Sequence, residues 1–596
     1  MKVRPRLIFI ILFSTMLIWL INLIWYKPFF INLYFERLFV EYGLRHPEIL
    51  TSARTLEKYG FTAHNRELNN ISLEYRLETF EKITKAFEML RSYKRNKLDQ
   101  EEQLSHDVLD FYLEKIIFKQ QFFQHEIPLN HLDGLQATLP TFLIENQKVE
   151  NLQDAEHYLD RISKISEKVY QYIQTIMLKD EGDKPPAFVF EYMIAQIDTF
   201  LTNDIEDNLL ISDFKRKISS ANLINPDAKS ELLYNLRLEI GDNVYPAFKE
   251  LRIKLEVERE HASDQVGIWQ YNDGDAYYYL LLNESLTLDT SMYDLEEGAI
   301  AEIERLHKKA ADKLNVSKES VKEELQKLTS KASSNDNKDS FIHLKKNLIG
   351  VLEKTGFTSV NEGIILKNTM AFNARHKLTQ YNASSLDGHR KATLLISNPL
   401  LSFVPDYMLK GLALAEVFPG NHFMSENTRL TAQLPSIRKI INFNAYQQGW
   451  KYYVLEISPQ LKFTDSLLEE IGCIQWQLLY ASLAVADLRI HQNMISREEA
   501  IDFVISETGL PEQLVIPYID KVIVKPAYAP AYLVGFNAFK RLNHVLIPKN
   551  GDVSTQKFVS NIPKIANYGP VPIKFFSQLK LNDSSTKQFL AGSSTK

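Results

Sequence analysis

The chain has 596 residues, of which 45% are hydrophobic and 24% are charged, a composition typical of a large globular protein. Its 69 basic and 75 acidic residues give a formal net charge of −6, so charge offers no reason to expect nucleic acid as a partner. The single cysteine, Cys473, excludes an internal disulfide and a cluster of thiolate metal ligands.

The amino-terminal segment predicts a membrane anchor. The run from Leu7 to Trp25 contains no charge, and as a helix it would span roughly 28 Å, close to the hydrocarbon thickness of a bilayer. Lys2, Arg4 and Arg6 precede this run, and the positive-inside rule therefore leaves the amino terminus in the cytoplasm.

We accordingly expect a cytoplasmic tail at residues 1–6, a transmembrane signal anchor at residues 7–26 and the bulk of the chain outside the cytoplasm. In a bacterium this is a single-pass protein of the inner (cytoplasmic) membrane with its main domain on the periplasmic or extracytoplasmic side. A cleavable signal peptide is the alternative, but the stretch after Trp25 has no small-residue cleavage site.

Residues 30–580 predict one large, mainly α-helical body. Apolar residues recur at helical spacing in five long stretches, which are Ser72–Tyr93, Leu104–Phe123, Ala155–Met177, Ala228–Val257 and Glu296–Leu314. Asn272-Asp-Gly274 separates two runs rich in aromatic and β-branched residues, so a short β-hairpin is expected there. Residues 316–347 are polar and predict a helical excursion or loop, and residues 581–596 predict a disordered tail.

The segment from Leu412 to Met424 carries the first candidate chemistry. It combines an apolar helical pattern with one carboxylate, Glu416, then a Pro419-Gly420 step and an imidazole, His422. Asp487 and His491 form a second candidate: they are four residues apart on an apolar helix, so the carboxylate could hydrogen-bond to the imidazole and orient it. A surface ion pair is the alternative for this second pair.

At these residues the chain resembles the bacterial family called domain of unknown function 885, mostly helical proteins grouped with the zinc metallopeptidases. The resemblance runs from about residue 32 to residue 580, and it depends on the order and spacing of several short segments. These are Leu132-Asp-Gly134, Gly267-Ile-Trp269, Asp273 to Tyr278, Asp387-Gly-His-Arg390, Asp487 to His491, Ser496 to Ile501, Pro526 to Gly535 and Gly569-Pro-Val-Pro572.

The signature of that family is His-Glu-x-x-Pro-Gly-His-His followed by Glu-Gly-Trp-Ala, which implies a zincin-like fold and a zinc site. Imidazoles and a carboxylate would hold Zn²⁺, and the glutamate after the first histidine would deprotonate the bound water. Two ligands seven residues apart on a straight helix lie roughly 10 Å apart, too far for one zinc. The helix must therefore break at Pro419-Gly420.

Most ligand positions of the signature are replaced in this chain. Glu416 remains as a vestigial general base and His422 as a vestigial ligand, whereas the other polar positions hold Ala415, Asn421 and Gln448. Too few ligands remain for a catalytic zinc, which normally takes three from the protein. No metal or other cofactor is therefore expected, and zinc is the alternative.

The leading hypothesis is a membrane-anchored, metallopeptidase-like protein that has lost catalysis and binds a peptide or protein in the cell envelope. Two alternatives stay open: an active zinc peptidase with a rearranged site built from Glu416, His422, Asp487 and His491, with Glu426 or Glu456, and a purely structural envelope protein. The binding hypothesis predicts a cleft lined by Tyr277, Arg390, His422, Trp450, Asp487, His491 and Tyr532.

Overall fold

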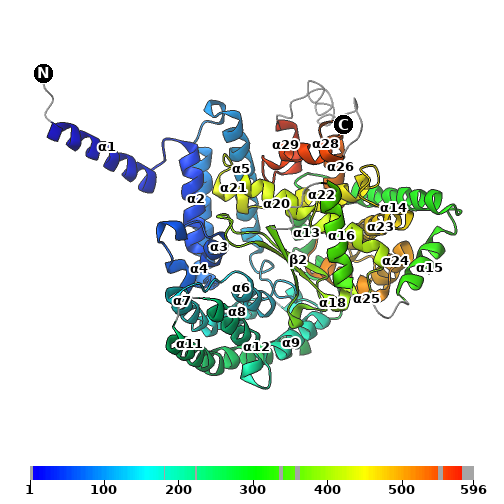
Figure 1. The fold of residues 1–596 in the computed structure, drawn as a ribbon, viewed down its shortest axis with the longest axis horizontal. Helices are drawn as coiled ribbons and strands as arrows, with labels where there is room; N and C mark the ends of the chain where they lie inside the picture. Colours follow the sequence, from blue (N-terminus) through cyan, green and yellow to red (C-terminus); the bar gives the residue numbers. More distant parts are fainter. Residues whose placement is uncertain are drawn as a thin grey trace.

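A computed structural model describes residues 5–179, 181–221, 225–333, 340–355, 363–547 and 555–579. The chain is mainly α-helical, as the sequence predicts, and it also contains one small sheet (Figure 1). The helices of the first half are α1 Pro5–Trp25, α2 Ile31–Arg45, α3 Pro47–Ala53, α4 Leu73–Arg91, α5 Gln100–Lys119, α6 Leu135–Glu145, α7 Leu152–Ile162, α8 Ile165–Met177, α9 Ala187–Phe200, α10 Leu209–Ser220, α11 Pro226–Glu239, α12 Tyr245–Glu260, α13 Gly274–Leu286 and α14 Met292–Leu314. Those of the second half are α15 Val321–Ser333, α16 Ser340–Thr355, α18 Asn398–Leu401, α19 Asp406–Glu416, α20 Asn421–Leu430, α21 Ser436–Ile440, α22 Asn444–Ile457, α23 Leu467–His491, α24 Arg497–Thr508, α25 Glu512–Val524, α26 Pro530–Arg541, α27 Asn543–Leu546, α28 Thr555–Asn561 and α29 Pro563–Ala566.

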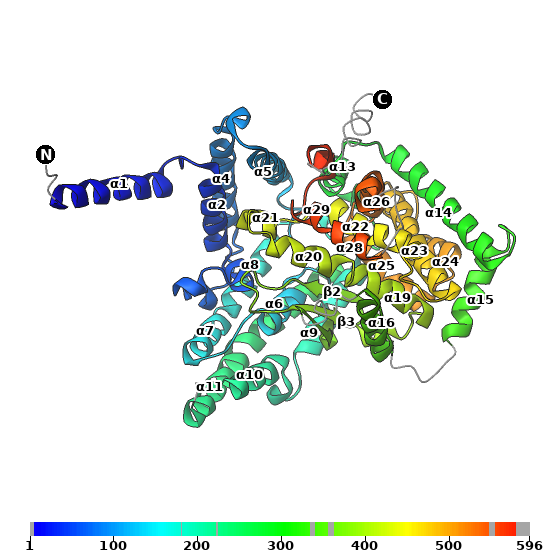
Figure 2. The same cartoon turned by 45° about the horizontal axis from the view of Figure 1, so that its top comes forward.

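Helix α1 projects from the rest of the molecule (Figures 1 and 2). Its apolar side chains are exposed, and Phe9 and Trp25 keep 70% and 68% of their surface accessible. The guanidinium of Arg37 donates to the carbonyl oxygens of Leu23 and Tyr26, at 3.1 and 2.7 Å. This contact joins the carboxyl end of α1 to α2 and satisfies two carbonyls at a helix end.

Among the helix segments whose side chains are described, α23 is the one that is both long enough and apolar enough to cross a membrane, and the described part of α1, Leu12–Trp25, is shorter. Helix α23 is buried inside the protein over its apolar length, so here the same composition produces a core helix. Trp476 and Tyr480 are among the side chains that it buries.

The buried apolar side chains fall mainly into two clusters. The larger cluster includes residues from α2 to α5 and from α13 to α29, with α23 at its centre. The second cluster extends from Ile127 to Leu255 and holds α6 to α12 together, which form the lower part of Figure 1. Both clusters arise from helices whose apolar residues lie on one face.

Several predicted helices are confirmed with small changes at their ends. Ser72 caps α4 by accepting a hydrogen bond from the amide of Tyr75, which is the role that serine takes at a helix start. The predicted helix over Ala155–Met177 is divided into α7 and α8 at Ser163. The polar excursion contains α15 and α16, but its centre lies outside the described residues, as does the predicted tail at 581–596.

The predicted β-hairpin around Asn272-Asp-Gly274 is wrong. Asp273 takes a left-handed conformation, with φ of 55°, and α13 starts at the next residue. Gly274 is required there because an added Cβ would lie 1.9 Å from the carbonyl oxygen of Ile268. Two of the aromatic residues that suggest a strand pack as helix side chains instead, Tyr277 against Phe122 and Tyr278 against His491, so tertiary packing overrides their β propensity.

The small sheet is the feature that the sequence does not predict. Strand β3 (Ala392–Ile396) pairs in parallel with β1 (Ile364–Asn368) and antiparallel with β2 (Thr379–Asn382), so that Ile364 is opposite Ala392 and Thr379 is opposite Ile396. Every residue of β3 is buried. Side chains two residues apart on β2 point to the same face of the sheet, and this face meets α19 and α20.

Candidate functional site

The segment between α19 and α20 forms the predicted break. Helix α19 ends at Glu416 and α20 begins at Asn421, so the helix is interrupted at Pro419-Gly420 as predicted. An added Cβ at Gly420 would lie 2.0 Å from the carbonyl oxygen of Ala415, so only glycine fits. The indole N–H of Trp450 donates to the carbonyl oxygen of Pro419 at 2.9 Å and fixes the break to α22.

Glu416 is paired with a lysine. The ammonium nitrogen of Lys451 lies 2.9 Å from each carboxylate oxygen of Glu416, and the hydroxyl of Thr379 donates to one of them at 3.3 Å. Both charged residues are buried. Burial lowers the pKa of Lys451, but the negative charge of Glu416 outweighs it and the net pKa is raised. Lys451 therefore stays charged beside Glu416.

The other donors do not fit a zinc ion. Ala415 carries no ligand atom, the amide of Asn421 accepts from Gln447 at 2.9 Å, and Gln448 offers only a neutral oxygen. Within the described residues, no three or more histidine, cysteine, aspartate or glutamate side chains are grouped to hold a metal ion. The Lys451 ammonium also contacts both Glu416 oxygens, where a positive metal ion would be repelled.

The imidazole of His422 is buried next to the sheet. Its Nδ1 atom lies 3.0 Å from the hydroxyl of Tyr381 on β2, and the two ring centroids are 5.8 Å apart. Tyr381 and Thr379 are two residues apart on β2, so one face of this strand contacts both His422 and Glu416. Strand β2 therefore contacts both Glu416 and His422.

A cluster of tyrosines and a second lysine lies beyond Lys451. Lys521 lies 3.7 Å from the ring centroid of Tyr528, whose hydroxyl is 3.3 Å from that of Tyr532. Tyr532 in turn stacks on Tyr480 with ring centroids 4.1 Å apart. Burial raises the pKa of Tyr528, but the positive charges of Lys521 and Lys451 outweigh burial and lower it overall. Tyr532 therefore belongs to the packing around the ion pair.

Asp487 and His491 do not form the predicted pair, because Oδ1 and Nε2 are 4.0 Å apart. Asp487 accepts hydrogen bonds from the Tyr278 hydroxyl and the amides of Ala527 and Ala529, at 2.8 to 3.0 Å. Burial, partly offset by those bonds, raises its pKa to about 7.

His491 binds two backbone groups in place of the carboxylate. Its Nδ1 atom accepts from the amide of Ile268 at 3.1 Å, so the proton lies on Nε2, 3.1 Å from the carbonyl oxygen of Val522. Burial lowers its pKa to about 4. Asp487 and His491 therefore join α23 to neighbouring loops, a structural role that the sequence interpretation missed.

The rearranged zinc site is also not assembled. Glu426 accepts from Arg429 at 2.9 Å, and Glu456 is paired with Arg305 and Lys309 at 3.2 and 2.9 Å. Each of these carboxylates thus has a cationic partner already.

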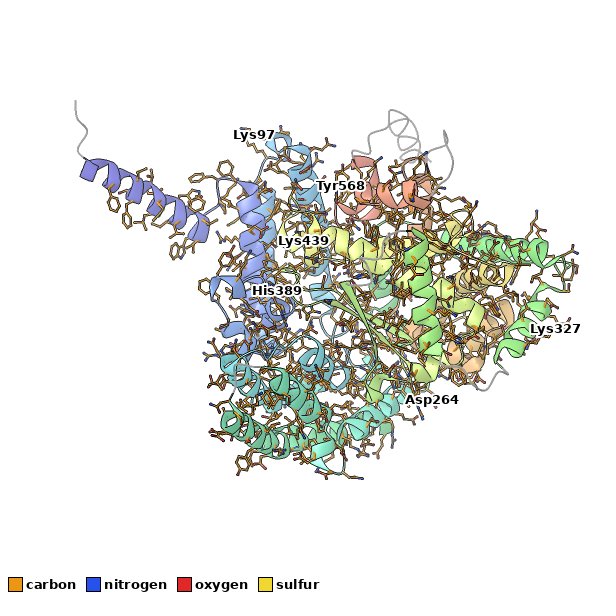
Figure 3. The ribbon with its side chains drawn as sticks, viewed as in Figure 1. Lys97, Asp264, Lys327, His389, Lys439 and Tyr568 are labelled. Atoms are coloured by element: carbon orange, nitrogen blue, oxygen red, sulfur yellow. The ribbon has the colours of Figure 1, made fainter. Side chains whose placement is uncertain are left out.

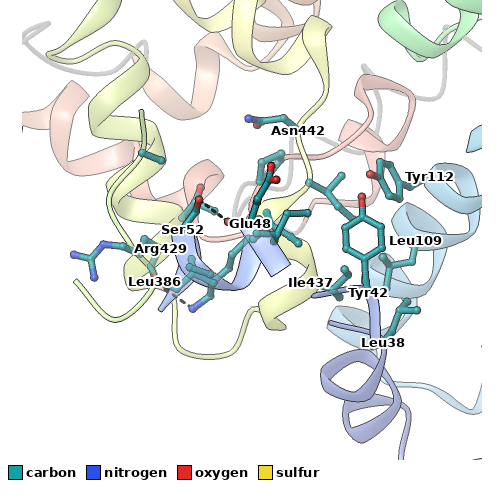
Figure 4. Close-up of a pocket in the computed structure, with 18 of the residues that line it drawn as sticks. Leu38, Tyr42, Glu48, Ser52, Leu109, Tyr112, Leu386, Arg429, Ile437 and Asn442 are labelled. Carbon is teal, nitrogen blue, oxygen red and sulfur yellow. Dashed lines mark hydrogen bonds between the residues drawn. The ribbon is translucent and has the colours of Figure 1, made fainter. Parts of the chain in front are cut away.

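A large cavity lies beside the helix break. Its volume is about 980 Å³, and its walls come from α2 to α5 on one side and from the β2–β3 loop, α20, α21 and α22 on the other. Figure 4 shows Tyr42 and Tyr112 on the first side, across from Leu386 and Arg429. This volume is at the upper end of the range for ligand sites.

The residues of the predicted cleft are divided between this cavity and other parts of the protein. Arg390 and Trp450 line the cavity together with Asn421, whereas His422, Asp487, His491 and Tyr532 do not. Tyr277 is also elsewhere, because it is buried and its hydroxyl donates to Glu126 at 2.5 Å. The cause is the helical register: in α22, Trp450 faces the cavity while the next residue, Lys451, faces Glu416.

Lys451 is the residue that the sequence interpretation missed. Its signal was available, because Lys451 takes the alanine position of the Glu-Gly-Trp-Ala motif and follows Gln448 by three residues. Residues at this spacing share a helix face. Tyr381 and Thr379 carried no such signal, since the strand that holds them was not predicted.

The chain belongs to a family of helical proteins whose activity is not defined. It matches the family described as "Bacterial protein of unknown function (DUF885)" over residues 54–575, which confirms the resemblance but leaves the metallopeptidase motifs as an expectation. No curated protein matches the chain in sequence.

Two solved structures share the fold. The putative lipoprotein from Colwellia psychrerythraea has a TM-score of 0.82 at 17% identity, covering 94% of this chain and 99% of that one. A putative lipoprotein of unknown function from Shewanella oneidensis has a TM-score of 0.64 at 15% identity, covering 92% and 99%. At these identities the similarity describes the fold alone.

Proposed function

We propose that the protein is a membrane-anchored envelope protein that binds peptides or protein segments without hydrolysing them. The observation that carries this proposal is the ion pair between Lys451 and Glu416. A general base must accept a proton from water, but both oxygens of Glu416 already accept hydrogen bonds from an ammonium group. The position of the base is therefore closed, while the cavity beside it is open.

The anchor is the second part of the proposal. Between Phe9 and Trp25, the described side chains of helix α1 include many exposed apolar ones, and 21 residues of helix are about 32 Å long, enough to cross the hydrocarbon layer. The two structural neighbours carry lipoprotein descriptions. In this chain, whose single cysteine is the buried Cys473, a transmembrane helix would provide the tether in place of a lipid.

Binding without hydrolysis can be tested on the full chain in detergent micelles. A pool of random hexapeptides is equilibrated across a dialysis membrane, and peptides on both sides are measured by mass spectrometry. We expect some peptides to be retained intact. Cleavage that disappears in Glu416→Gln would show an active peptidase, and a pool that is neither retained nor cleaved would overturn the binding function.

The topology can be tested separately. Protease added to intact spheroplasts should digest the domain that follows α1, because the positive-inside rule places it outside the cytoplasm. Protection of the domain until the membrane is permeabilised would place it in the cytoplasm and remove the envelope from the proposal.

A further inference from the structure

The cavity beside Trp450 has an excess of positive charge, although the chain as a whole carries a net charge of −6. Its charged lining residues are cationic at Arg37, Arg45, Lys82, Lys85, Arg390, Arg429 and Lys439, and anionic at Glu41 and Glu48. A concave surface lined mainly by one sign of charge concentrates ligands of the opposite sign.

Four of the seven cations have a glutamate partner, because Arg37 and Arg429 each pair with one, and Arg45 and Lys82 share Glu78. The part of the chain that the structure describes offers Lys85, Arg390 and Lys439 no carboxylate within 4.0 Å. Arg390 donates to the carbonyl oxygen of Ser52 at 3.1 Å, and Lys439 to that of Arg429 at 3.0 Å. A carbonyl accepts a hydrogen bond but does not cancel a charge, so three positive charges remain on three separate elements.

Amide side chains are the second feature of the cavity wall. They are Asn69, Asn146, Asn382, Asn421, Asn442 and Gln447, and each combines a donor with an acceptor, as a peptide bond does. The amide nitrogen of Asn382 is buried and has no hydrogen-bond partner within the described residues. An acyl chain in this cavity would leave the Asn382 amide nitrogen without a partner, at a cost of about 1–3 kcal/mol. A peptide backbone could satisfy them.

The cavity lies next to a second one. A neighbouring cavity of about 450 Å³ shares six lining residues with the first, namely Tyr42, Asn69, Thr79, Ile83, Tyr112 and Ile116. The two adjoining cavities together are called the groove, and these shared side chains line both of them. A compact small molecule would need one cavity, whereas an extended chain can lie across both.

We propose that the groove binds an acidic peptide, whose carboxylates would contact Lys85, Arg390 and Lys439 while its backbone contacts the amide-lined wall. This inference rests on the proposed peptide-binding function and adds the class of peptide. It requires no catalytic group, because the contacts are ion pairs and hydrogen bonds alone.

The experiment compares two pools of amidated hexapeptides in equilibrium dialysis with the full chain in detergent micelles. One pool contains aspartate and glutamate, and the other contains asparagine and glutamine at the same positions. We expect about tenfold higher retention of the acidic pool at low salt, and a decrease as salt rises. Equal retention of both pools would overturn the acidic preference but leave peptide binding standing, whereas retention of neither would overturn both.

Two variants locate the binding charges. Lys85 is exposed on α4 and Lys439 is half-buried on α21, so Lys85→Gln combined with Lys439→Gln removes two unpaired cations from opposite walls. This variant should lose most of the preference for the acidic pool. Lys327→Gln is the matched control, because Lys327 is 53% exposed and lies at the far edge of the molecule (Figure 3). An equal loss in the control, or none in the double variant, would remove the groove as the site.

Discussion

The helix break and the groove beside it differ in how their charged side chains are paired. At the break, one buried carboxylate meets one buried ammonium, and both oxygens of Glu416 are occupied by Lys451. In the groove, Lys85, Arg390 and Lys439 have no carboxylate partner within the described residues. The difference is that the carboxylate at the break already has a cationic partner, whereas these cations of the groove could still contact an anionic ligand.

Helix α22 connects the two regions. Gln447 and Trp450 face the groove, whereas Lys451 faces Glu416, because successive residues on a helix point about 100° apart. Gly449 lets α26 approach closely, since an added Cβ would lie 2.3 Å from the Cα of Gly535. Substitutions on either face of α22 therefore test one region with little direct change to the other.

The largest effect is expected from breaking the buried ion pair. Lys451→Ala should destabilise the fold by about 3–5 kcal/mol, because Glu416 is left as an unpaired buried charge. Chemical unfolding followed by circular dichroism measures this change. The double variant Glu416→Gln with Lys451→Met should recover most of that loss, since neither residue is then charged.

Equal destabilisation by Lys451→Ala and by the double variant would contradict the ion pair as the main interaction at the break. The retention of hexapeptides should stay within about twofold of wild type in the double variant, which is less than 0.5 kcal/mol. A complete loss of retention would show that the two regions are one site.

A smaller effect is expected from pH through His491, which links α23 to Ile268 and to Val522 of α25. The unfolded pKa is near 6.5 and the folded pKa is about 4, so the stability that neutral His491 contributes is present above pH 6.5 and is lost as the pH falls towards 4. The loss is about 3 kcal/mol over this range. Unfolding measured at several pH values should show this dependence in wild type and less of it in His491→Gln.

The comparison with His491→Gln is necessary because other histidines titrate in the same range. Burial also lowers the pKa of His46 and His64 to about 4. Identical pH dependence in wild type and His491→Gln would mean that His491 is not held neutral by its two backbone partners.

The smallest effect is expected at Tyr381, which touches both regions. Its hydroxyl contacts His422 and its side chain lines the groove. Tyr381→Phe removes one hydrogen bond and should destabilise the fold by about 1 kcal/mol. Hexapeptide retention should change little, because the unpaired cations remain. A large loss of retention with unchanged stability would make Tyr381 a direct binding residue.

The sequence predicts the parts of the fold that depend on local periodicity. The helices α4, α5 and α14 follow from apolar spacing, and the break at Pro419-Gly420 follows from the chemistry of those two residues. The hairpin prediction at Asn272-Asp-Gly274 failed because the packing of α13 decides the conformation there. Strand β2 was missed because its four residues carry no strong pattern and are stabilised by pairing with β3.

The position of the candidate site in the chain was predictable, but the hydrogen bonds and ion pairs of its side chains were not. The motif comparison identifies Glu416, His422 and the replaced positions, yet it does not place Lys451 against Glu416, because that contact joins residues 35 apart in sequence. The Asp487–His491 spacing allowed a direct hydrogen bond, but each side chain hydrogen-bonds to backbone groups instead. Such choices depend on neighbours that only the folded chain brings together.

The central claim is that the ammonium of Lys451 lies where a metal ion would otherwise bind beside Glu416. Measuring the zinc content tests this claim most directly. The full chain is purified in detergent, equilibrated with excess Zn²⁺, dialysed and measured by inductively coupled plasma mass spectrometry, with Lys451→Ala in parallel. The account predicts no stoichiometric zinc in wild type. One zinc per wild-type chain, lost in Glu416→Gln, would contradict it and restore a metal centre to the site.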